Sequence, residues 1–450
     1  MGPALPPPRS ASRVDPPHKG KGNRLHHLHF WPVGTTLNPV LAPDKDAALS
    51  LLNAAAVRER AEKMLALGLD DRLPNFRIDL ARLEDAADLV LKLTRAAYPT
   101  LDVPFHSRWR HFVVDGVDRW TAIEGVRRWG DAAERGRAAF DLAIVSVLLD
   151  AGAGPAWRYR DAVSGREISR SEGLALASLD MFAAGAFSQS DDPLRVNAAA
   201  LMNLTDDALR RGFQVSADNP LAGVEGRADL LRRLGRTVAD NPAVFAQRDT
   251  PRPGGLFDHL AALAPDGSIA APKILAELLR HLSSIWPSRL TLAGMPLGDC
   301  WRHSLMTTRD ATSGLVPLHK LSQWLTYSLI EPLQQAVIAV TDIDGLTGLA
   351  EYRNGGLLID AGVLVLRDAA TATQAHAVDS ELVVEWRALT VALLDRAAAL
   401  IRTRLQMDAE ALPLAKILQG GTWTAGRVIA QQLRPDASPP IRVISDGTVF

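Results

Sequence analysis

The chain has 450 residues, 47% of them hydrophobic, enough for one large domain or two with a sizeable core. Its net charge of −1 argues against a protein that binds duplex nucleic acid, because such proteins carry an excess of Lys and Arg. The single cysteine, Cys300, excludes an internal disulfide framework. We therefore expect a reducing, cytoplasmic setting.

No apolar run is long enough to cross a bilayer, so no membrane association is expected. Residues 1–45 begin with a Pro-rich stretch and lack the apolar core of a signal peptide, and we predict that they form a disordered extension. The cluster of His26, His27 and His29 in this extension could bind a metal, but isolated His tracts in tails are seldom specific. No metal site and no cofactor are predicted.

Helical apolar periodicity dominates from residue 46 onward, and residues 46–450 are predicted to form a helical catalytic domain. Helices are expected after Asp79, over 140–149, from Ser171, over 227–239, 273–285 and 321–340, and from Ser380. Short strands are expected at 112–114, 362–366 and 441–444. The prediction is a mainly α protein with a few short strands, in a single large domain that leaves room for two lobes.

Several catalytic motifs are absent from the sequence. It has no Gly-rich phosphate loop followed by Lys, no dinucleotide-binding glycine fingerprint after a strand, no His-Glu-x-x-His, no paired zinc cysteines and no Gly-x-Ser-x-Gly. These absences leave acid–base chemistry by carboxylates as the simplest option.

Glu351 and Arg353 lie in the segment Leu346–Gly356, where Asn354-Gly355-Gly356 suggests a turn. We expect the pair to sit where an element ends, because a rigid element aims catalytic groups while a turn keeps them accessible. A surface ion pair between the two is the alternative.

His319, Lys320 and Gln323 open the helix predicted over 321–340. A lysine at a helix start opposes the helix dipole, and an anionic partner would remove that conflict. A solvated lysine is the alternative.

The segment Phe105–Phe112 concentrates basic and aromatic residues, among them His106 and Trp109. Arg108 and Arg110 could bind a phosphate while Trp109 stacks on a planar group. Because Arg–Trp neighbours recur along the chain, ordinary packing is the alternative.

Two further segments complete the candidates. Glu385, near the start of the last long helix, either has a chemical role or pairs with an arginine such as Arg387. Gln419-Gly-Gly-Thr422-Trp423 either presents backbone N–H groups to an anion or is a helix stop followed by an N-cap.

Together these segments resemble the uracil-catabolism protein four family, also called the uracil-regulated Urg family, from about residue 46 to Phe450. This resemblance implies a role in a pyrimidine breakdown route in which uracil becomes a nucleotide, the ring opens and a ribosylurea-type species appears. It also leaves room for association with other uracil-catabolic enzymes.

A weaker resemblance links residues 320–323, 346–353 and 385–388 to the queuosine-salvage family of nucleotide N-glycosylases, whose helical fold is akin to that of DNA glycosylases. That family has aspartate before Tyr-Arg, whereas this chain has Glu351. The longer side chain shifts its carboxylate.

The two resemblances together imply hydrolysis of an N-glycosidic bond between ribose, or ribose 5-phosphate, and a urea-like nitrogen. The alternatives are an amidohydrolase of a ring-opened pyrimidine nucleotide and a non-catalytic partner that holds an intermediate. The predicted catalytic residues are Glu351, Lys320 and Glu385. The residues predicted to bind this nucleotide-derived small molecule are His106, Arg108, Trp109, Arg110, His319, Gln323, Tyr352, Arg353, Arg387, Thr422 and Trp423.

Overall fold

Residues 43–246, 250–286 and 290–444 are described in a computed structural model of the chain. They belong to one compact unit that begins at Ala42. Residues 1–42 of the predicted extension, with His26, His27 and His29, lie outside the described residues, whereas residues 43–45 belong to the first helix.

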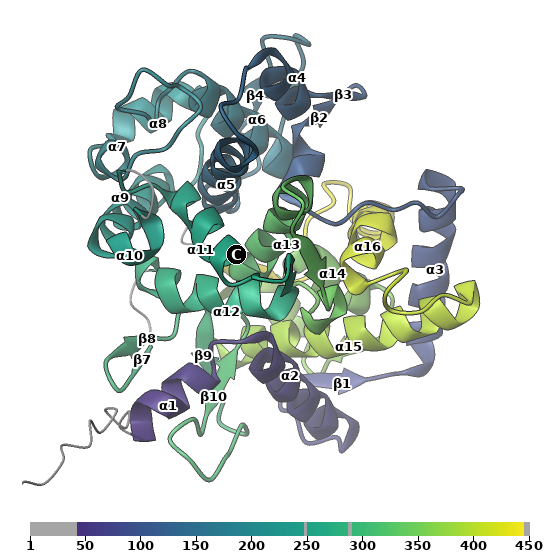
Figure 1. The fold of residues 1–450 in the computed structure, drawn as a ribbon. Helices are drawn as coiled ribbons and strands as arrows, with labels where there is room; N and C mark the ends of the chain where they lie inside the picture. The colour runs from purple at the N-terminus through teal and green to yellow at the C-terminus, as the bar shows by residue number, and fades with distance from the viewer. Residues whose placement is uncertain (1–42, 247–249, 287–289, 445–450) are drawn as a thin grey trace, which may run out of the picture. The chain divides into compact units, whose positions relative to one another are not determined.

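Helices dominate this unit, which confirms the predicted mainly α class (Figure 1). The α-helices are α1 (Pro43–Ser50), α2 (Ala54–Leu69), α3 (Ala81–Ala97), α4 (Arg119–Val126), α5 (Ala132–Leu148), α6 (Arg170–Ala183), α7 (Ala198–Met202), α8 (Asp206–Gly212), α9 (Val224–Asp240), α10 (Pro242–Phe245), α11 (Leu256–Ala262), α12 (Ala271–Leu282), α13 (Lys320–Gln335), α14 (Tyr352–Asp360), α15 (Glu381–Leu405), α16 (Leu414–Ile417) and α17 (Trp423–Leu433).

The strands are short and pair two by two. The pairs are β1 (Phe76–Ile78) with β12 (Leu364–Leu366), β2 (Val113–Val114) with β3 (Val117–Asp118), β4 (Tyr159–Arg160) with β5 (Glu167–Ile168), β6 (Ser268–Ala270) with β11 (Ala339–Thr341), β7 (Thr291–Leu292) with β8 (Met295–Pro296), β9 (Cys300–Arg302) with β10 (Leu315–Pro317), and β13 (Ala375–Ala377) with β14 (Arg442–Ile444). The predicted strands near 113, 364 and 442 are therefore confirmed.

The helix predicted over 321–340 is shorter than expected. α13 ends at Gln335, and residues 339–341 form β11, which runs parallel to β6. Pro332 lies inside the last turns of the helix, and Val337 adopts a φ of 63° that right-handed helices exclude. Apolar periodicity continues past this break, which is why the sequence suggested a longer helix.

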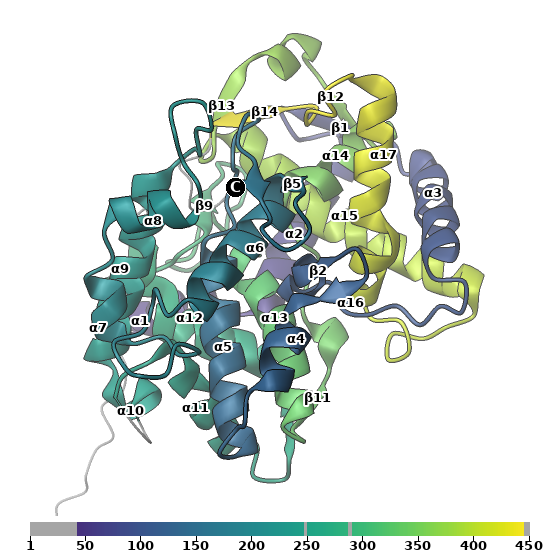
Figure 2. The same cartoon turned by 90° about the horizontal axis from the view of Figure 1, so that it is seen from above.

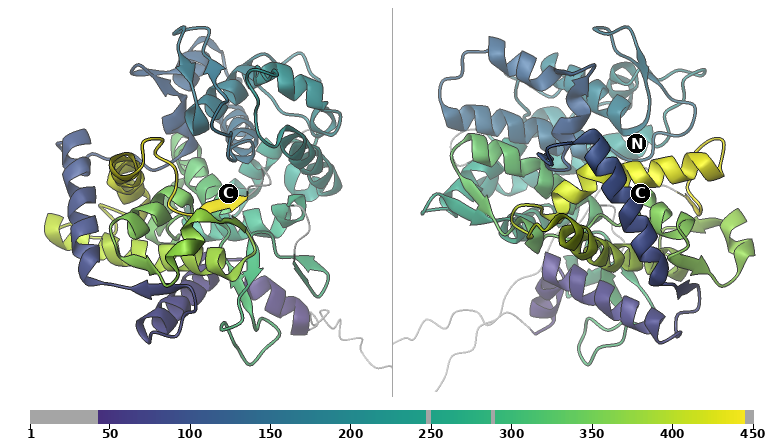
Figure 3. Two further views of the ribbon diagram at one scale, coloured as in Figure 1. Left: turned by 180° about the vertical axis from the view of Figure 1, so that it is seen from behind. Right: turned by 90° about the vertical axis from the view of Figure 1, so that its right-hand side faces the viewer.

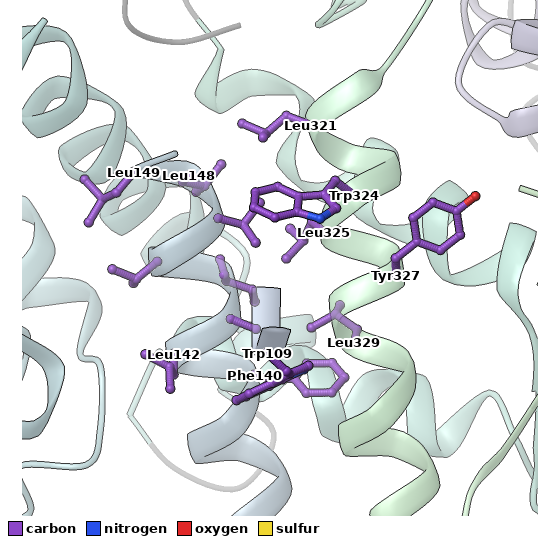
Figure 4. Packing of buried hydrophobic residues seen from close by; sticks show 14 of the residues in the cluster. Trp109, Phe140, Leu142, Leu148, Leu149, Leu321, Trp324, Leu325, Tyr327 and Leu329 are labelled. Atoms are coloured by element: carbon purple, nitrogen blue, oxygen red, sulfur yellow. The ribbon is translucent and has the colours of Figure 1, made fainter. Parts of the chain in front are cut away.

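The largest hydrophobic cluster is built around α5 and α13 (Figure 4). Phe140 and Leu148 of α5 face Leu325 and Leu329 of α13, and all four are buried. Burying each of these side chains contributes roughly 1.5–3 kcal/mol. The helix predicted over 140–149 is thus the central one, as its apolar composition indicated.

A second cluster joins α2, α3 and α15 with β1 and β12. α15 connects the two clusters, because Leu389 and Leu393 belong to the second while Leu394 and Ile401 belong to the first. α3 packs against α15 and α17 (Figure 3).

Asp141 is a charged residue in the middle of apolar α5. Its carboxylate is fully buried and accepts hydrogen bonds from Arg252 Nη2 (2.6 Å) and Nε (2.9 Å), and from the backbone N–H groups of Val196 and Gly254. A buried charge needs such a complete set of partners. Asp141 therefore ties α5 to two distant loops.

α14 and α17 pack directly against each other (Figure 2). A Cβ on Gly426 of α17 would collide with the carbonyl oxygen of Arg353, and a Cβ on Gly355 would collide with Trp386 of α15. The predicted turn at Asn354-Gly355-Gly356 is therefore wrong. These glycines lie inside α14 and permit close helix contacts.

We predict that Gly426→Ala lowers the free energy of unfolding by about 1–3 kcal/mol, since the added methyl must displace backbone. Gly125→Ala is the matched control, because Gly125 lies within α4 with open space around its Cβ position. It should be neutral or stabilising by up to about 1 kcal/mol. Urea denaturation measures both, and equal effects would contradict the close contact.

Candidate active site

A cavity of about 710 Å³ lies where the loop after α5, the start of α6 and the C-terminal segment before β14 come together. Its volume is typical of small-molecule sites. α6, α13 and α14 all begin at its wall, at Arg170, Lys320 and Tyr352. The positive ends of three helix dipoles therefore point toward this part of the molecule.

Glu351 is the N-cap residue of α14 and lines the cavity. Its Oε2 accepts a hydrogen bond from the N–H of Arg353 (2.7 Å), and its Oε1 accepts one from the N–H of Asn354 (2.6 Å). Burial raises the pKa of Glu351, against the opposing effects of these two N–H groups and of Lys320. The carboxylate is thus held rigidly, at the start of an element rather than at its end as predicted.

Lys320 is the first residue of α13 and also lines the cavity. Its side chain makes no hydrogen bond within the described part of the chain, and its charge acts on Glu351, His106 and Asp150. Its backbone N–H donates to Asp299 Oδ2 (2.9 Å). The unfavourable interaction of Lys320 with the dipole of α13 is opposed by the negative charges of Glu351 and Asp150, which also line the cavity.

Asp299 and Arg387 form a buried ion pair behind these two residues. Arg387 donates through Nη1 and Nη2 to both carboxylate oxygens of Asp299, each at 2.8 Å, and through Nε to the carbonyl of Ala350 (3.1 Å). Burial acts to raise the pKa of Asp299, but Arg387 outweighs it and lowers that pKa. The pair joins the residue before Glu351 to the start of the helix that carries Lys320.

Asp150 provides a second carboxylate in the lining. It lies 3.3 Å from Arg108 Nη1, and both its oxygens lie within hydrogen-bond distance of the Ser171 hydroxyl (2.7 and 2.6 Å), which shares its one proton between them. Burial acts to raise its pKa, but Arg108, the Ser171 hydroxyl and other positive neighbours together lower it. Asp150 is therefore ionised at neutral pH.

His106 and His111 lie against Trp324 on the same side of the cavity. Burial lowers the pKa of His106 to about 4 and that of His111 to about 3. Nη1 of Arg108 lies 3.3 Å from Nδ1 of His111, and a guanidinium can only donate. His111 is therefore a neutral imidazole with its proton on Nε2.

Of the other predicted residues, Tyr352, Arg353 and Trp423 also line the cavity. The guanidinium of Arg353 lies over the ring of Tyr352, 4.9 Å from its centroid, and Nη1 donates to the carbonyl of Ala437 (3.0 Å). The guanidinium of Arg427 lies 5.6 Å from the centroid of Trp423.

Four predicted binding residues lie behind the lining. The indole of Trp109 donates to the carbonyl of Ser328 within the core, and Arg110 forms an ion pair with Glu331 (2.6 Å). The hydrogen-bond partners of His319 and Gln323 are the carbonyl of Leu51 and the hydroxyl of Thr347, respectively. These contacts fix α13 along its length.

Glu385 and Thr422 are likewise set back from the described cavity wall. Glu385 accepts hydrogen bonds from Asn75 and interacts with His303 Nε2 (3.0 Å), and it is completely buried. Thr422 belongs to a π-helical turn, Leu418–Thr422, that runs directly into α17. The expected anion-binding loop or helix stop at Gln419–Trp423 is wrong, because its glycines pack on Thr94 and Val90 of α3.

Sequence reasoning missed His111, Asp150, Arg170, Ser171 and Arg427. His111 stood in a segment that was singled out, so its neighbours could have suggested it. Asp150 lies just after the C-terminal end of α5, and Ser171 lies in the first turn of α6, where hydroxyl residues are usual. Their participation follows only from the tertiary arrangement.

One group of described residues has metal-ligand geometry: His259 of α11 with Glu277 and His281 of α12. Both imidazole Nε2 atoms lie near Glu277 Oε2, at 2.9 and 3.2 Å, and Lys273 lies 2.9 Å from the other oxygen. This group is separate from the cavity lining and is satisfied as an ion-pair cluster.

The fold and cavity define a helical protein with a cavity of small-molecule size, whose lining includes charged, aromatic and apolar side chains. Residues 50–450 match the family described as "Protein of unknown function (DUF1688)", and the chain belongs to that family. It is 41% identical over 419 residues to protein urg3 of Schizosaccharomyces pombe, covering 90% of this chain and 99% of the relative. It is 38% identical over 414 residues to uracil catabolism protein 4 of Lachancea kluyveri, covering 84% and 92%.

The resemblance to the uracil-catabolism protein four family is thus confirmed. Among the described helices, none combines the length and apolar character that a bilayer span requires.

We predict that Asp299→Asn lowers the free energy of unfolding at pH 7 by about 3–5 kcal/mol, because it leaves Arg387 buried without its counter-charge. Folding lowers the pKa of Asp299 below its value in the unfolded chain, about 3.9. The ionised carboxylate therefore stabilises the folded state above about pH 3.9, and this stabilisation is lost as the pH falls further. The difference between variant and wild type should therefore shrink below about pH 4.

Urea denaturation across pH measures this difference. Glu62→Gln is the control, since the Glu62–Arg396 pair is 41–44% exposed and should contribute less than about 1 kcal/mol. An Asp299→Asn variant no less stable than this control would refute the structural role of the pair.

Proposed function

We propose that this chain is an enzyme of uracil catabolism that hydrolyses the N-glycosidic bond between ribose and a urea-type nitrogen. The observation that carries the proposal is Glu351, a buried carboxylate that lines the cavity together with Lys320. The names of the two relatives, protein urg3 and uracil catabolism protein 4, support the pathway.

Cleavage of such a bond builds positive charge on the anomeric carbon of the sugar. A carboxylate fixed beside this carbon stabilises the charge, and this electrostatic stabilisation is stronger where water is excluded. Glu351 suits this role because two backbone N–H groups fix its position and each oxygen retains a lone pair.

Two carboxylates with pKa values shifted in opposite directions share the cavity. Asp150 stays ionised and adds negative charge that favours the cationic sugar, while Glu351, with its raised pKa, can exchange a proton. Such a division of roles is usual where one group stabilises charge and the other moves protons.

The proposed step balances as follows. Glu351 takes a proton from water as the oxygen attacks the anomeric carbon, and the carbon–nitrogen bond breaks with its electron pair going to the urea-type group. Lys320 supplies the proton that this leaving group must gain. Transfer of a proton from Glu351 to Lys320 then restores both residues.

We predict that Glu351→Gln lowers kcat on ribosylurea, or on its 5-phosphate, by at least about 10³-fold while substrate affinity changes little. The amide keeps the shape of the side chain but can neither carry the charge nor accept the proton. Free urea and reducing sugar are measured as products. Release of ammonia or carbamate with the sugar still attached would instead indicate an amidohydrolase.

Glu385→Gln is the matched control, because Glu385 is equally buried but set back from the lining. Its folded fraction should keep kcat within about threefold of wild type, although its stability falls. Full activity in Glu351→Gln, or binding of both substrates without turnover by wild type, would end the proposal.

We predict that kcat/KM rises with pH on the acidic side of the pH–rate profile, with a midpoint above about 4.3, the ordinary pKa of a glutamate. The reason is that Glu351 must be ionised for catalysis and burial raises its pKa. His106 and His111 add no limb near neutrality, since both are already neutral there. A pH–rate series measures the limb. If it stays at the same pH in the residual activity of Glu351→Gln, it belongs to another group.

A further inference from the structure

Three arginines from separate elements share one part of the cavity wall: Arg170 opens α6, Arg353 lies in the first turn of α14, and Arg427 lies in α17. Gly426 packs on the carbonyl oxygen of Arg353, so Arg427 follows directly after that contact. Arg427 Nη1 lies 3.8 Å from Glu172 Oε1, two residues beyond Arg170. The three guanidinium groups are therefore neighbours.

Of these three arginines, only Arg427 has an ion-pair partner among the described residues, Glu172. Arg353 is 3% exposed and its Nε–H has no partner among the described residues. The guanidinium of Arg170 makes no hydrogen bond or ion pair within that same part of the chain. Burial lowers the pKa of Arg170, and the charges of Arg353 and Arg427 lower it further. Repulsion between these guanidinium groups is costly, and a bound anion would relieve it.

Arg170 also has an unusual backbone. Its φ of 59° lies in the left-handed region, which is unfavourable for a residue with a long side chain. Arg170 thus stands at the positive end of α6, and Arg353 stands in the first turn of α14 at the same cavity wall. Both helix ends favour an anion at this wall.

We propose that Arg170, Arg353 and Arg427 form a subsite for the phosphate monoester of the substrate, so that the site accepts a pentose 5-phosphate in preference to a free pentose. Three guanidinium groups offer more donors than the two oxygens of a carboxylate can accept, whereas a phosphate monoester presents three terminal oxygens. The identity of the sugar rests on the proposed function. The anion subsite rests on the arginines alone.

This subsite differs from the phosphate grip that the sequence suggested. Arg108 is paired with Asp150, and Arg110 with Glu331, so neither is available in the way that Arg170 is. The phosphate is thus expected on the side of the cavity formed by α6, α14 and α17. The urea-type group then faces Trp324 and the neutral histidines.

The test is calorimetric binding of ribose 5-phosphate and of ribose to the full chain and its variants. Wild type should bind the phosphate form at least about tenfold more tightly, and more tightly still as the pH rises through about 6 and the phosphate becomes a dianion. Arg170→Gln and Arg427→Gln should each weaken binding of the phosphate form by about 10–100-fold while affinity for ribose stays the same.

Arg128→Gln is the control, because Arg128 is exposed after α4 and its loss removes the same charge away from the cavity. It should change neither affinity by more than about twofold. Circular dichroism and thermal unfolding establish that each variant is folded. Equal wild-type affinity for the two sugars, no binding of either, or an equal loss of both in the arginine variants would overturn the subsite.

Turnover separates this inference from the proposed function. Preferential binding of ribose 5-phosphate, with neither ribosylurea nor its phosphate cleaved, would keep the subsite and refute the glycosidase. Equal binding and equal cleavage of the phosphorylated and free forms would keep the glycosidase and refute the subsite.

Discussion

The ion pair between Asp299 and Arg387 is the interaction on which the geometry of the cavity depends. Lys320 is held through its own N–H, which donates to Asp299, and Glu351 through the preceding carbonyl, which accepts from Arg387. The two ends of the pair thus set the positions of residues from α13 and α14. A shift of α15, which carries Arg387, would move both together.

A buried ion pair is costly to desolvate and seldom adds stability relative to a well-packed apolar alternative. This pair is retained in a favourable form because Asp299 also accepts from the indole of Trp301 (2.6 Å) and from Lys320. What it contributes is a fixed geometry, since planar bidentate contacts tolerate little rotation. In a site where a small displacement lowers the rate, fixed geometry is what catalysis requires.

The sequence predicted most of the architecture because burial of apolar faces decides it. The central helix and the strands near 113, 364 and 442 are where periodicity and turn residues placed them. It failed at Gly355, because a glycine that permits close packing and a glycine that makes a turn look the same in the sequence. The distinction depends on Trp386, which approaches from another helix.

The candidate site likewise contains some residues that the sequence could reveal and others that it could not. Glu351, Lys320 and Arg353 could be found because each conflicts with its local sequence context or stands beside a second charged group. Asp150 and Arg170 were not found, because the residues that give them a role come from distant parts of the sequence. Asp150 has its pKa lowered by Arg108, which lies more than forty residues away in the sequence.

Glu351 serves the fold and the proposed chemistry with the same two oxygen atoms. As the N-cap of α14 it is favoured in its ionised form by two N–H groups and the helix dipole, and burial opposes that form. The raised pKa shows that burial prevails. Because a ligand that displaced the remaining water would strengthen the same effect, the tendency of Glu351 to take a proton would increase just when a substrate is bound. The position that begins the helix is thereby also the one best suited to accept a proton.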